Sequence, residues 1–273
     1  STTVPALPYQ VPLASYLSIN SSSESFNNSN GIEIDDTDDK NVRYVGATPK
    51  NYIKFNNETW RIIGVFNDIT TIDENGNEKK ESLVKIIRNE SLGSYSWDSS
   101  ASSVNSGYGI NEWSQADLMT ELNNDYINTS KTSGTTTWYN GINNSKKGTY
   151  DYSNNIKSAF INKIANVRWS TGRATWQSSV LNSYNQERST ASIRTPSDNV
   201  PRTNTWNGKI ALIYPSDYGY ASTDTTCRNN LYECSNDENK TNNWLFKNTD
   251  YWTLSPYSGD SSSVVGMPGG GAV

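Results

Sequence analysis

The stretch from residue 59 to residue 90 constrains the fold more than any other part of the chain. It reads TWRIIGVFNDITTIDENGNEKKESLVKIIRNE, in which two segments rich in apolar and β-branched residues flank a polar centre. Such segments favour strands. The centre contains Asn75-Gly76, a strong signal for a tight turn because both residues accept positive φ. The stretch therefore predicts an antiparallel hairpin.

Two acidic patterns resemble calcium loops, and neither meets the full requirement. Asp73, Asn75 and Asn77 have the right spacing, but Glu78 stands where an EF-hand needs glycine, so the hairpin is preferred. The run Asp35-Asp36-Thr37-Asp38-Asp39 lacks both the glycine and the distal glutamate. A solvated turn is the preferred interpretation of this run. A bound cation there is the alternative, and we predict no metal.

Other segments add short strands and two helices. Strand composition recurs in VRYVG, NYIKF and KIALIY (residues 209–214), the last being a buried strand that ends at a Pro-Ser-Asp turn. Ser114-Gln115-Ala116-Asp117 reads as a capping box that opens a helix in SQADLMTELNNDY. In SNNIKSAFINKIANV, apolar residues repeat every four positions and predict a second short amphipathic helix. The expected class is α+β, with antiparallel hairpins, two short helices and long ordered loops.

The composition indicates a folded protein with an aromatic core. The 273 residues include 9 Trp and 17 Tyr, which bury more area per side chain than Val does. The net charge of −5 gives no support to nucleic-acid binding, which needs a basic face. No run of 18 apolar residues is present, so we expect membrane attachment only through an anchor that the sequence does not include.

The two cysteines predict a disulfide and an oxidising compartment. Cys227 and Cys234 lie in a hydrophilic, loop-like stretch, where a pair of exposed thiols is best explained by a disulfide. Two cysteines without any histidine cannot complete a usual zinc shell. We therefore expect an extracellular protein.

Residues 1–31 form a distinct Pro- and Ser-rich arm, and residues 32–273 a single α+β domain. Pro5, Pro8 and Pro12 disfavour a helix and predict an extended arm. The arm is either a loose terminus or a strand that docks on its own domain or on a neighbouring subunit. Its apolar content favours docking through residues 4–19.

The absence of histidine argues against most catalytic sites. It removes Ser-His-Asp and Cys-His arrangements and the commonest general base near neutral pH. A pair of carboxylates could still hydrolyse glycosides, with candidates near aromatic residues at Glu58, Glu112, Glu121 and Asp217. Surface solvation is the default for each of them. We expect no enzyme activity and no cofactor.

The C-terminal 22 residues, WTLSPYSGDSSSVVGMPGGGAV, predict a displayed surface. An aromatic anchor precedes a tail of Gly, Ser, Val and Ala. Tyr and Ser suit binding surfaces, because Tyr offers contact area at low entropic cost and Ser adapts its hydrogen bonds. For Trp252 and Leu254 a role as core anchors is the preferred alternative. The predicted ligand-binding residues are Tyr251, Trp252, Tyr257, Ser258, Asp260, Ser261, Ser262 and Ser263.

Three stretches together resemble a family of exported surface domains common in gut Firmicutes, often found behind a prepilin-type segment. They are DDTDDKNVRYVGATPKNYIKFNNETWRIIGVFN, KIALIYPSDYGYAS with the cysteine loop, and NNWLFKNTDYWTLSPYS. The C-terminal half resembles the C-type-lectin fold of variable proteins of diversity-generating retroelements. The resemblance implies an α+β, C-type-lectin-like domain at the bacterial cell surface, without a known catalytic role, whose C-terminal region contacts ligands.

The chain departs from this family at its end. Relatives continue into a closing apolar strand, roughly VRPVLYL, which does not follow Val273. Either the chain is incomplete, or another segment such as residues 4–19 supplies the strand. The first functional hypothesis is an adhesin-like module that binds an unknown protein or glycan. The alternative is a structural subunit of a pilus-like filament, joined as a homo-oligomer by donation of the N-terminal strand.

Overall fold

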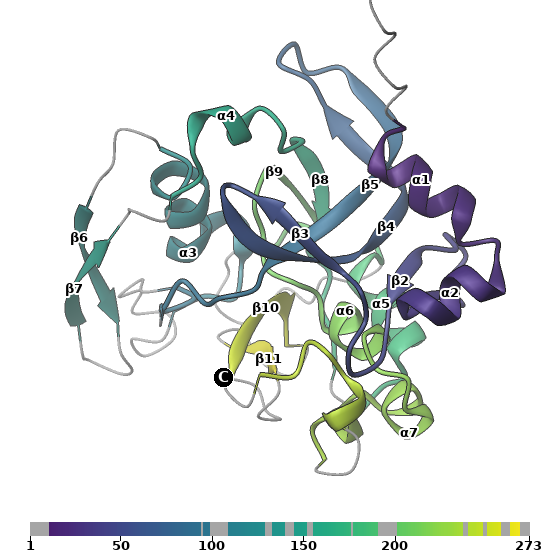
Figure 1. The fold of residues 1–273 in the computed structure, drawn as a ribbon. Helices are drawn as coiled ribbons and strands as arrows, with labels where there is room; N and C mark the ends of the chain where they lie inside the picture. The colour runs from purple at the N-terminus through teal and green to yellow at the C-terminus, as the bar shows by residue number, and fades with distance from the viewer. Residues whose placement is uncertain are drawn as a thin grey trace, which may run out of the picture.

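The protein is described by a computed structural model with an α+β architecture of antiparallel sheets and short helices (Figure 1), which confirms the expected class. The described residues are 11–93, 95–98, 109–128, 133–139, 145–151, 155–175, 177–190, 201–236, 240–247, 250–257 and 263–267. Within 133–139 and 145–151 the description is confined to the backbone.

A seven-stranded sheet is built around one long strand, β4 (Glu58–Ile72). On this strand pair β5 (Glu78–Arg88), β3 (Tyr52–Phe55) and β2 (Val42–Tyr44), all antiparallel. The sheet is extended on one side by β1 (Ile32–Ile34) and on the other by β8 (Val167–Ser170) and β9 (Thr205–Gly208). β4 and β5 confirm the predicted hairpin.

The hairpin turn differs in detail from the sequence prediction. Asp73 accepts hydrogen bonds from the backbone N–H groups of Asn75 and Asn77, at 2.8 Å each. Only Gly76 has positive φ, at 82°. The Asp73 carboxylate thus organises a longer turn with one left-handed glycine, where Asn-Gly alone predicted two left-handed residues.

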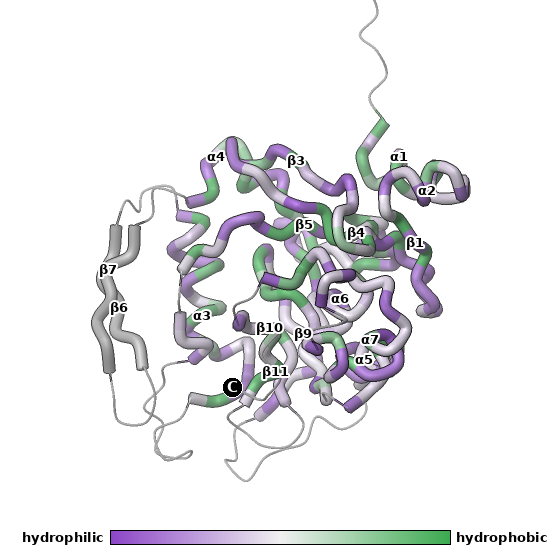
Figure 2. The backbone as a smooth tube through the Cα atoms, turned by 60° about the horizontal axis from the view of Figure 1, so that its bottom comes forward, coloured by the Kyte–Doolittle hydropathy of each residue, from purple (hydrophilic) through white to green (hydrophobic). Residues whose placement is uncertain are grey.

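The central part of β4 is buried on both of its faces. Neighbouring residues of a strand point to opposite faces, so they pack with different hydrophobic clusters. Ile62 and Val65 pack with one hydrophobic cluster, whose other members are Leu17, Ile32, Val42 and Tyr44. Ile63 and Phe66 pack with another, which includes Tyr184, Tyr218, Tyr220, Leu231, Val265 and Met267. Hydrophobic stretches therefore recur along the chain between hydrophilic ones (Figure 2).

A third hydrophobic cluster is rich in tryptophan and includes Trp60 of β4. Its buried members include Trp97, Trp113, Leu118, Leu122, Tyr126, Ile156, Leu254 and Val264. The rings of Trp97 and Trp113 are 5.4 Å apart, and Trp206 stands edge-on to Trp113 at 5.9 Å. This cluster confirms the expectation of an aromatic core.

The two predicted helices are present but shorter than expected. The first region contains a 3₁₀ turn (Trp113–Gln115), α3 (Asp117–Thr120) and a π-helical turn (Glu121–Asp125). The predicted capping box does not form, because the Ser114 hydroxyl donates to Glu112 instead, at 2.6 Å. The second region contains only α4 (Ser158–Ile161).

Residues 209–214 do not form the predicted strand, although they are partly or fully buried. The side chain of Asn123 takes the place of a neighbouring strand: its Oδ1 accepts from the N–H of Ile210 at 3.1 Å, and its Nδ2 donates to the Ile210 carbonyl at 2.8 Å. The segment runs into α6 (Pro215–Tyr220), which has proline at its first position. α5 (Val180–Glu187) lies beside α6 (Figure 1).

The prediction of an extended N-terminal arm is wrong for its described part. α1 (Leu13–Asn20) begins directly after Pro12, a position where proline is tolerated, and its Leu17 is buried against the sheet. α2 (Glu24–Asn30) starts at Ser23, whose side chain accepts from the Phe26 N–H, and ends at Gly31 with φ 71°. Residues 13–20 are therefore not available as a donated strand. Residues 4–10 lie outside the described residues.

The predicted disulfide between Cys227 and Cys234 is confirmed, but its surroundings differ from those expected. Both cysteines are buried, and they lie in α7 (Thr225–Asn229) and in a 3₁₀ helix (Leu231–Ser235). Another 3₁₀ turn follows at Lys240–Asn242. In the part of the chain that the structure describes, no helix combines the length and apolar character needed to cross a membrane.

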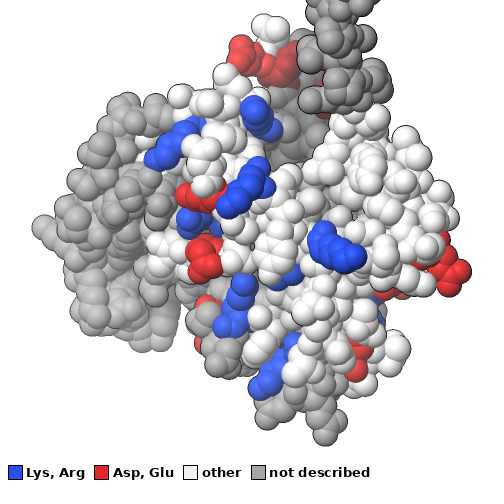
Figure 3. Space-filling view, in the orientation of Figure 1, with Lys and Arg blue, Asp and Glu red and all other residues white. Residues whose placement is uncertain are grey.

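Two smaller sheets complete the fold. β6 (Ser133–Tyr139) pairs with β7 (Ser145–Asp151), and β10 (Tyr251–Pro256) pairs with β11 (Val264–Met267). Positive and negative side chains are scattered among uncharged ones on the face shown in Figure 3.

Candidate functional site

The C-terminal hairpin is anchored in the core along its whole described length. Thr253, Leu254, Ser255 and Val265 are fully buried. The end of the hairpin is closed by a hydrogen bond from the Tyr257 N–H to the Ser263 carbonyl, at 2.9 Å. Ala174 adds a second support, because its N–H donates to the Pro256 carbonyl at 3.0 Å. The strands therefore hold residues 257 and 263 in fixed positions.

Two more segments meet the hairpin at this end. Asn111 is buried, and its Nδ2 donates to the Ser263 carbonyl at 2.8 Å. Its Oδ1 accepts from Nε and Nη2 of Arg202, at 3.1 and 3.0 Å. Asn111 is separated from Arg202 by 91 positions and from Ser263 by 152. We call this meeting point of Asn111, Arg202 and Ser263 the loop-end junction.

Neighbouring side chains secure the junction. Glu112 Oε2 accepts from the Thr203 N–H at 3.0 Å, so the segment after Arg202 is tied to the one that follows Asn111. Asp98 Oδ2 accepts from the Ile110 N–H at 2.9 Å. Hydrogen bonds thus join Asp98 to Ile110, Glu112 to Thr203 and Tyr257 to Ser263.

The structure places four of the eight predicted ligand-binding residues, and they have different roles. Tyr251 and Trp252 are half-buried, and their polar atoms serve the fold: Tyr251 Oη donates to the Leu245 carbonyl and Trp252 Nε1 to the Tyr95 carbonyl, both at 2.7 Å. Tyr257 and Ser263 are half-buried at the hairpin end. Ser258, Asp260, Ser261 and Ser262 lie outside the described residues. Leu254 is fully buried, as its interpretation as a core anchor expected.

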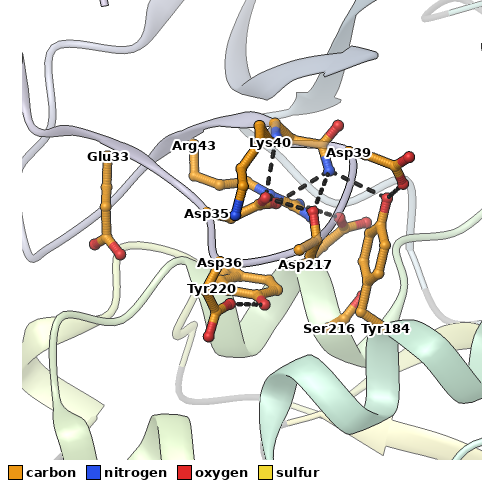
Figure 4. Close-up of polar contacts among 12 residues, drawn as sticks. Glu33, Asp35, Asp36, Asp39, Lys40, Arg43, Tyr184, Ser216, Asp217 and Tyr220 are labelled. Carbon is orange, nitrogen blue, oxygen red and sulfur yellow. Dashed lines mark hydrogen bonds and ion pairs between the residues drawn. The ribbon is translucent and has the colours of Figure 1, made fainter. Parts of the chain in front are cut away.

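A second assembly, which the sequence analysis did not predict, joins the central sheet to α6 (Figure 4). Arg43 of β2 donates through Nε to Asp35 at 2.9 Å and through Nη1 to Asp217 of α6 at 2.8 Å. Lys85 of β5 also contacts Asp217. The side chains of Asp35 and Asp217 are 0% exposed, and that of Arg43 is 2% exposed. We call Asp35, Arg43, Lys85 and Asp217 the buried ion cluster.

Aromatic rings enclose the cluster. The Arg43 guanidinium lies 4.2 Å from the ring centre of Phe66 and 4.7 Å from that of Tyr220. Burial alone would raise the pKa of Asp217, but Lys85 and Arg43 outweigh it and lower the pKa to about 2. Burial also opposes ionisation of Asp35, and Arg43 again shifts its pKa below the usual value.

The interpretation of residues 35–39 as a solvated turn holds only in part: Asp36 and Asp38 are exposed in a turn, but other residues of the run are tied into the core. Asp35 and Thr37 are buried, and three side chains bind Asp35: those of Thr37, Asn41 and Arg43. Tyr184 Oη donates to Asp39 at 2.5 Å, and Tyr220 Oη donates to Asp36. Asp35 thus pairs with a buried arginine, and Asp36 and Asp39 accept hydrogen bonds from phenol hydroxyls. These partners are distant in sequence, so the local pattern could not reveal them.

The other acidic candidates are distributed over separate structural contacts. Glu58 pairs with Arg88 at 3.0 Å, Glu112 binds Ser114 and Thr203, and Asp217 belongs to the ion cluster. Glu187, which the sequence analysis did not select, is buried and accepts from the N–H and hydroxyl of Ser216. Burial raises its pKa, against the opposing effect of Arg188. Among the described residues, no three His, Cys, Asp or Glu side chains are grouped to hold a metal ion.

Comparison with known proteins gives no match: the chain matches no family model, no curated protein and no solved structure.

Proposed function

We propose that the chain is an extracellular binding module whose ligand surface is centred on the loop-end junction. The observation that carries the proposal is the convergence of Asn111, Arg202 and Ser263, which come from three distant segments and meet through hydrogen bonds at 2.8–3.1 Å. A binding surface that is held on a fixed scaffold loses less entropy on binding.

The residue types around the junction suit recognition of a protein or glycan. Tyr257 is half-buried there and offers part of its ring, and the chain between Tyr257 and Ser263 reads SGDSS. Tyr and Ser together provide contact area and adaptable hydrogen bonds. We include Ser258, Asp260, Ser261 and Ser262 in the proposed surface on the basis of sequence. Tyr251 and Trp252 act as supports beneath it, since their polar atoms bind backbone carbonyls.

An oxidising location is part of the proposal. The Cys227–Cys234 disulfide supports it, because disulfides persist mainly outside the cytosol. Display at a bacterial cell surface, a C-type-lectin-like arrangement and a relation to diversified variable proteins rest on the sequence resemblance alone. We propose the binding module rather than the strand-donating filament subunit because residues 13–20 form a helix that packs on their own sheet.

The experiment is a binding screen with a matched control. The labelled protein is applied to a printed array of glycans and to a panel of extracellular-matrix proteins. A variant with Tyr257, Asp260 and Ser262 all replaced by alanine should lose at least tenfold in affinity for any hit and keep the wild-type melting temperature. Tyr232→Ala, at a tyrosine that is 47% exposed, should change neither. Unaltered binding by the triple variant, or its unfolding, would contradict the proposal.

A further inference from the structure

The contact between Lys85 and Asp217 brings an amine and a carboxyl together in a dry, aromatic environment. Lys85 comes from β5 and Asp217 from the first turn of α6, 132 positions later. The Asp217 side chain is 0% exposed and that of Lys85 is 13% exposed. The Lys85 Nζ lies 4.4 Å from the ring centre of Tyr214 and 5.3 Å from those of Phe66 and Trp169. Water has little access to this pair.

The two oxygens of Asp217 have different partners. Oδ1 accepts from Arg43 Nη1 at 2.8 Å. Oδ2 accepts from the Tyr214 N–H at 3.0 Å and contacts Lys85 Nζ. The carboxyl group is therefore fixed in orientation, with its Oδ2 toward the amine and its Oδ1 toward a permanent positive charge.

We propose that Lys85 and Asp217 condense to an intramolecular isopeptide bond. The lone pair of Lys85 Nζ attacks Cγ of Asp217, and the Cγ–Oδ2 bond breaks. Of the three protons on the ammonium group, two leave with Oδ2 as water and one stays on the amide nitrogen. Oδ1 becomes the amide carbonyl oxygen. No oxidant, reductant or further reactant is needed.

Arg43 and the fold supply the conditions for this step. In the tetrahedral intermediate, negative charge develops on Oδ1, where Arg43 already donates a hydrogen bond, as a preorganised oxyanion donor does. Fixing both groups in one geometry removes the entropic cost of bringing them together, an advantage of roughly 10⁵–10⁸ M in effective concentration. Condensation also removes two buried charges, whose desolvation is costly.

The protonation states of Lys85 and Asp217 determine the rate of the reaction. Burial lowers the pKa of Lys85, an effect that Asp217 partly offsets, so the folded site favours release of a proton from the amine. Asp217 itself is ionised before reaction, because Lys85 and Arg43 outweigh the effect of burial on its pKa. The attack therefore follows proton transfer across the contact, and we expect a slow maturation after folding. The bond would join β5 to α6 independently of the proposed binding surface.

The test is the intact mass of the folded, purified protein after reduction of its disulfide. The bond lowers the mass by that of one water molecule. Trypsin then yields the peptides 81–88 and 210–228 as one branched species, with the chain uncut after Lys85. A full-length mass equal to that of the uncondensed sequence, or separate peptides 81–85 and 86–88, would overturn the proposal.

Two variants assign the loss of water to this pair. Lys85→Arg keeps the positive charge but removes the nucleophilic amine, and it should show the full mass. Lys80→Arg alters a lysine in an exposed ion pair with Asp68, at 2.8 Å, and should still lose one water. Loss of water in Lys85→Arg would show that it occurs elsewhere and would contradict the assignment. Because the wild-type mass is measured directly, the test does not depend on the variants folding.

Discussion

The buried ion cluster and the loop-end junction both join segments that are far apart in sequence, but they do so with different interactions. The cluster uses charged side chains that are 0–13% exposed, so every partner needs the opposite charge beside it. The junction uses the amide of Asn111, the guanidinium of Arg202 and a backbone carbonyl of Ser263. Backbone carbonyls are present in every residue type.

This difference predicts where the chain tolerates change. A buried charge that loses its partner cannot be solvated, so the composition of the cluster is fixed by electrostatics. The junction needs the Asn111 amide, but it binds residue 263 through the main chain. This contact does not depend on which side chain stands at position 263, so it is compatible with sequence variation at that position.

The largest expected effect follows from Arg43→Met. The variant leaves the Asp35 carboxylate buried without the guanidinium beside it, whether or not Asp217 has condensed with Lys85, and removing one member of a buried pair costs about 3–5 kcal/mol. Chemical denaturation measures the free energy of unfolding. Arg168→Met breaks the partly exposed pair with Glu78 and should cost at most about 1 kcal/mol. Equal losses of unfolding free energy in the two variants would show that the burial of the Arg43 ion pairs does not make them more stabilising than the partly exposed pair.

Gly64→Ala tests the backbone geometry that places Arg43. β2 lies so close to β4 here that a Cβ on residue 64 would collide with the Val42 carbonyl oxygen. Because both groups are held in the sheet, we expect a loss of about 1–3 kcal/mol in unfolding free energy. Gly76→Ala, in the exposed turn, is strained only by its φ of 82° and should cost about 1 kcal/mol. A tolerated alanine at position 64 would mean that β2 can shift.

The hairpin of residues 59–90 could be predicted because its signals are local. Two segments rich in apolar and β-branched residues and the polar turn between them indicate β4 and β5 without help from the rest of the chain. The arm and the segment 209–214 were mispredicted for a related reason. Pro12 limits where α1 begins but does not prevent it, and the side chain of Asn123 replaces a strand that the sequence alone suggests.

The loop-end junction and the buried ion cluster could be predicted from the sequence to different degrees. Tyr257 and Ser263 could be selected from composition, because a Tyr/Ser/Gly-rich end is a compositional signal. Their partners Asn111 and Arg202 could not, since only the fold brings them within hydrogen-bonding distance. Asp35 and Asp217 of the ion cluster were noted separately, the first in an acidic run and the second as a candidate carboxylate. Their pairing with Arg43 was missed, because no local pattern shows which carboxylate an arginine inside the strand-like segment VRYVG will meet.

Asn111→Ala should separate local from global effects at the junction. The variant removes the amide that binds the Ser263 carbonyl and should cost about 1–2 kcal/mol. Hydrogen exchange should become faster at the amide of Tyr257, which donates to the same carbonyl, while the β4–β5 amides stay protected. Ser263→Ala keeps the carbonyl and should leave the hydrogen bond from Asn111 Nδ2 in place, so exchange at the Tyr257 amide should stay slower than in Asn111→Ala. Faster exchange throughout the central sheet would contradict the local character of the junction.

The smallest effect concerns alkaline pH and again separates the two regions. Burial, reinforced by Asp39 and opposed by Arg188, raises the pKa of Tyr184 from 10.0 to about 12. The stabilising contribution of the neutral phenol is therefore complete below pH 10.0 and is lost as the pH rises toward about 12. Urea midpoints of Tyr184→Phe and wild type should converge over this range.

The matched control is Tyr232→Phe, which removes a hydroxyl from a residue that is 47% exposed. Its urea midpoint should stay at a constant offset from wild type. Tyr184 Oη donates to Asp39 at 2.5 Å, so ionisation would place a phenolate beside a carboxylate, a repulsion that an exposed tyrosine does not meet. If the difference in urea midpoint between Tyr184→Phe and wild type were also independent of pH, the hydrogen bond to Asp39 would contribute no electrostatic stability. The acidic run and the loop-end junction would then differ only in the geometry of their hydrogen bonds.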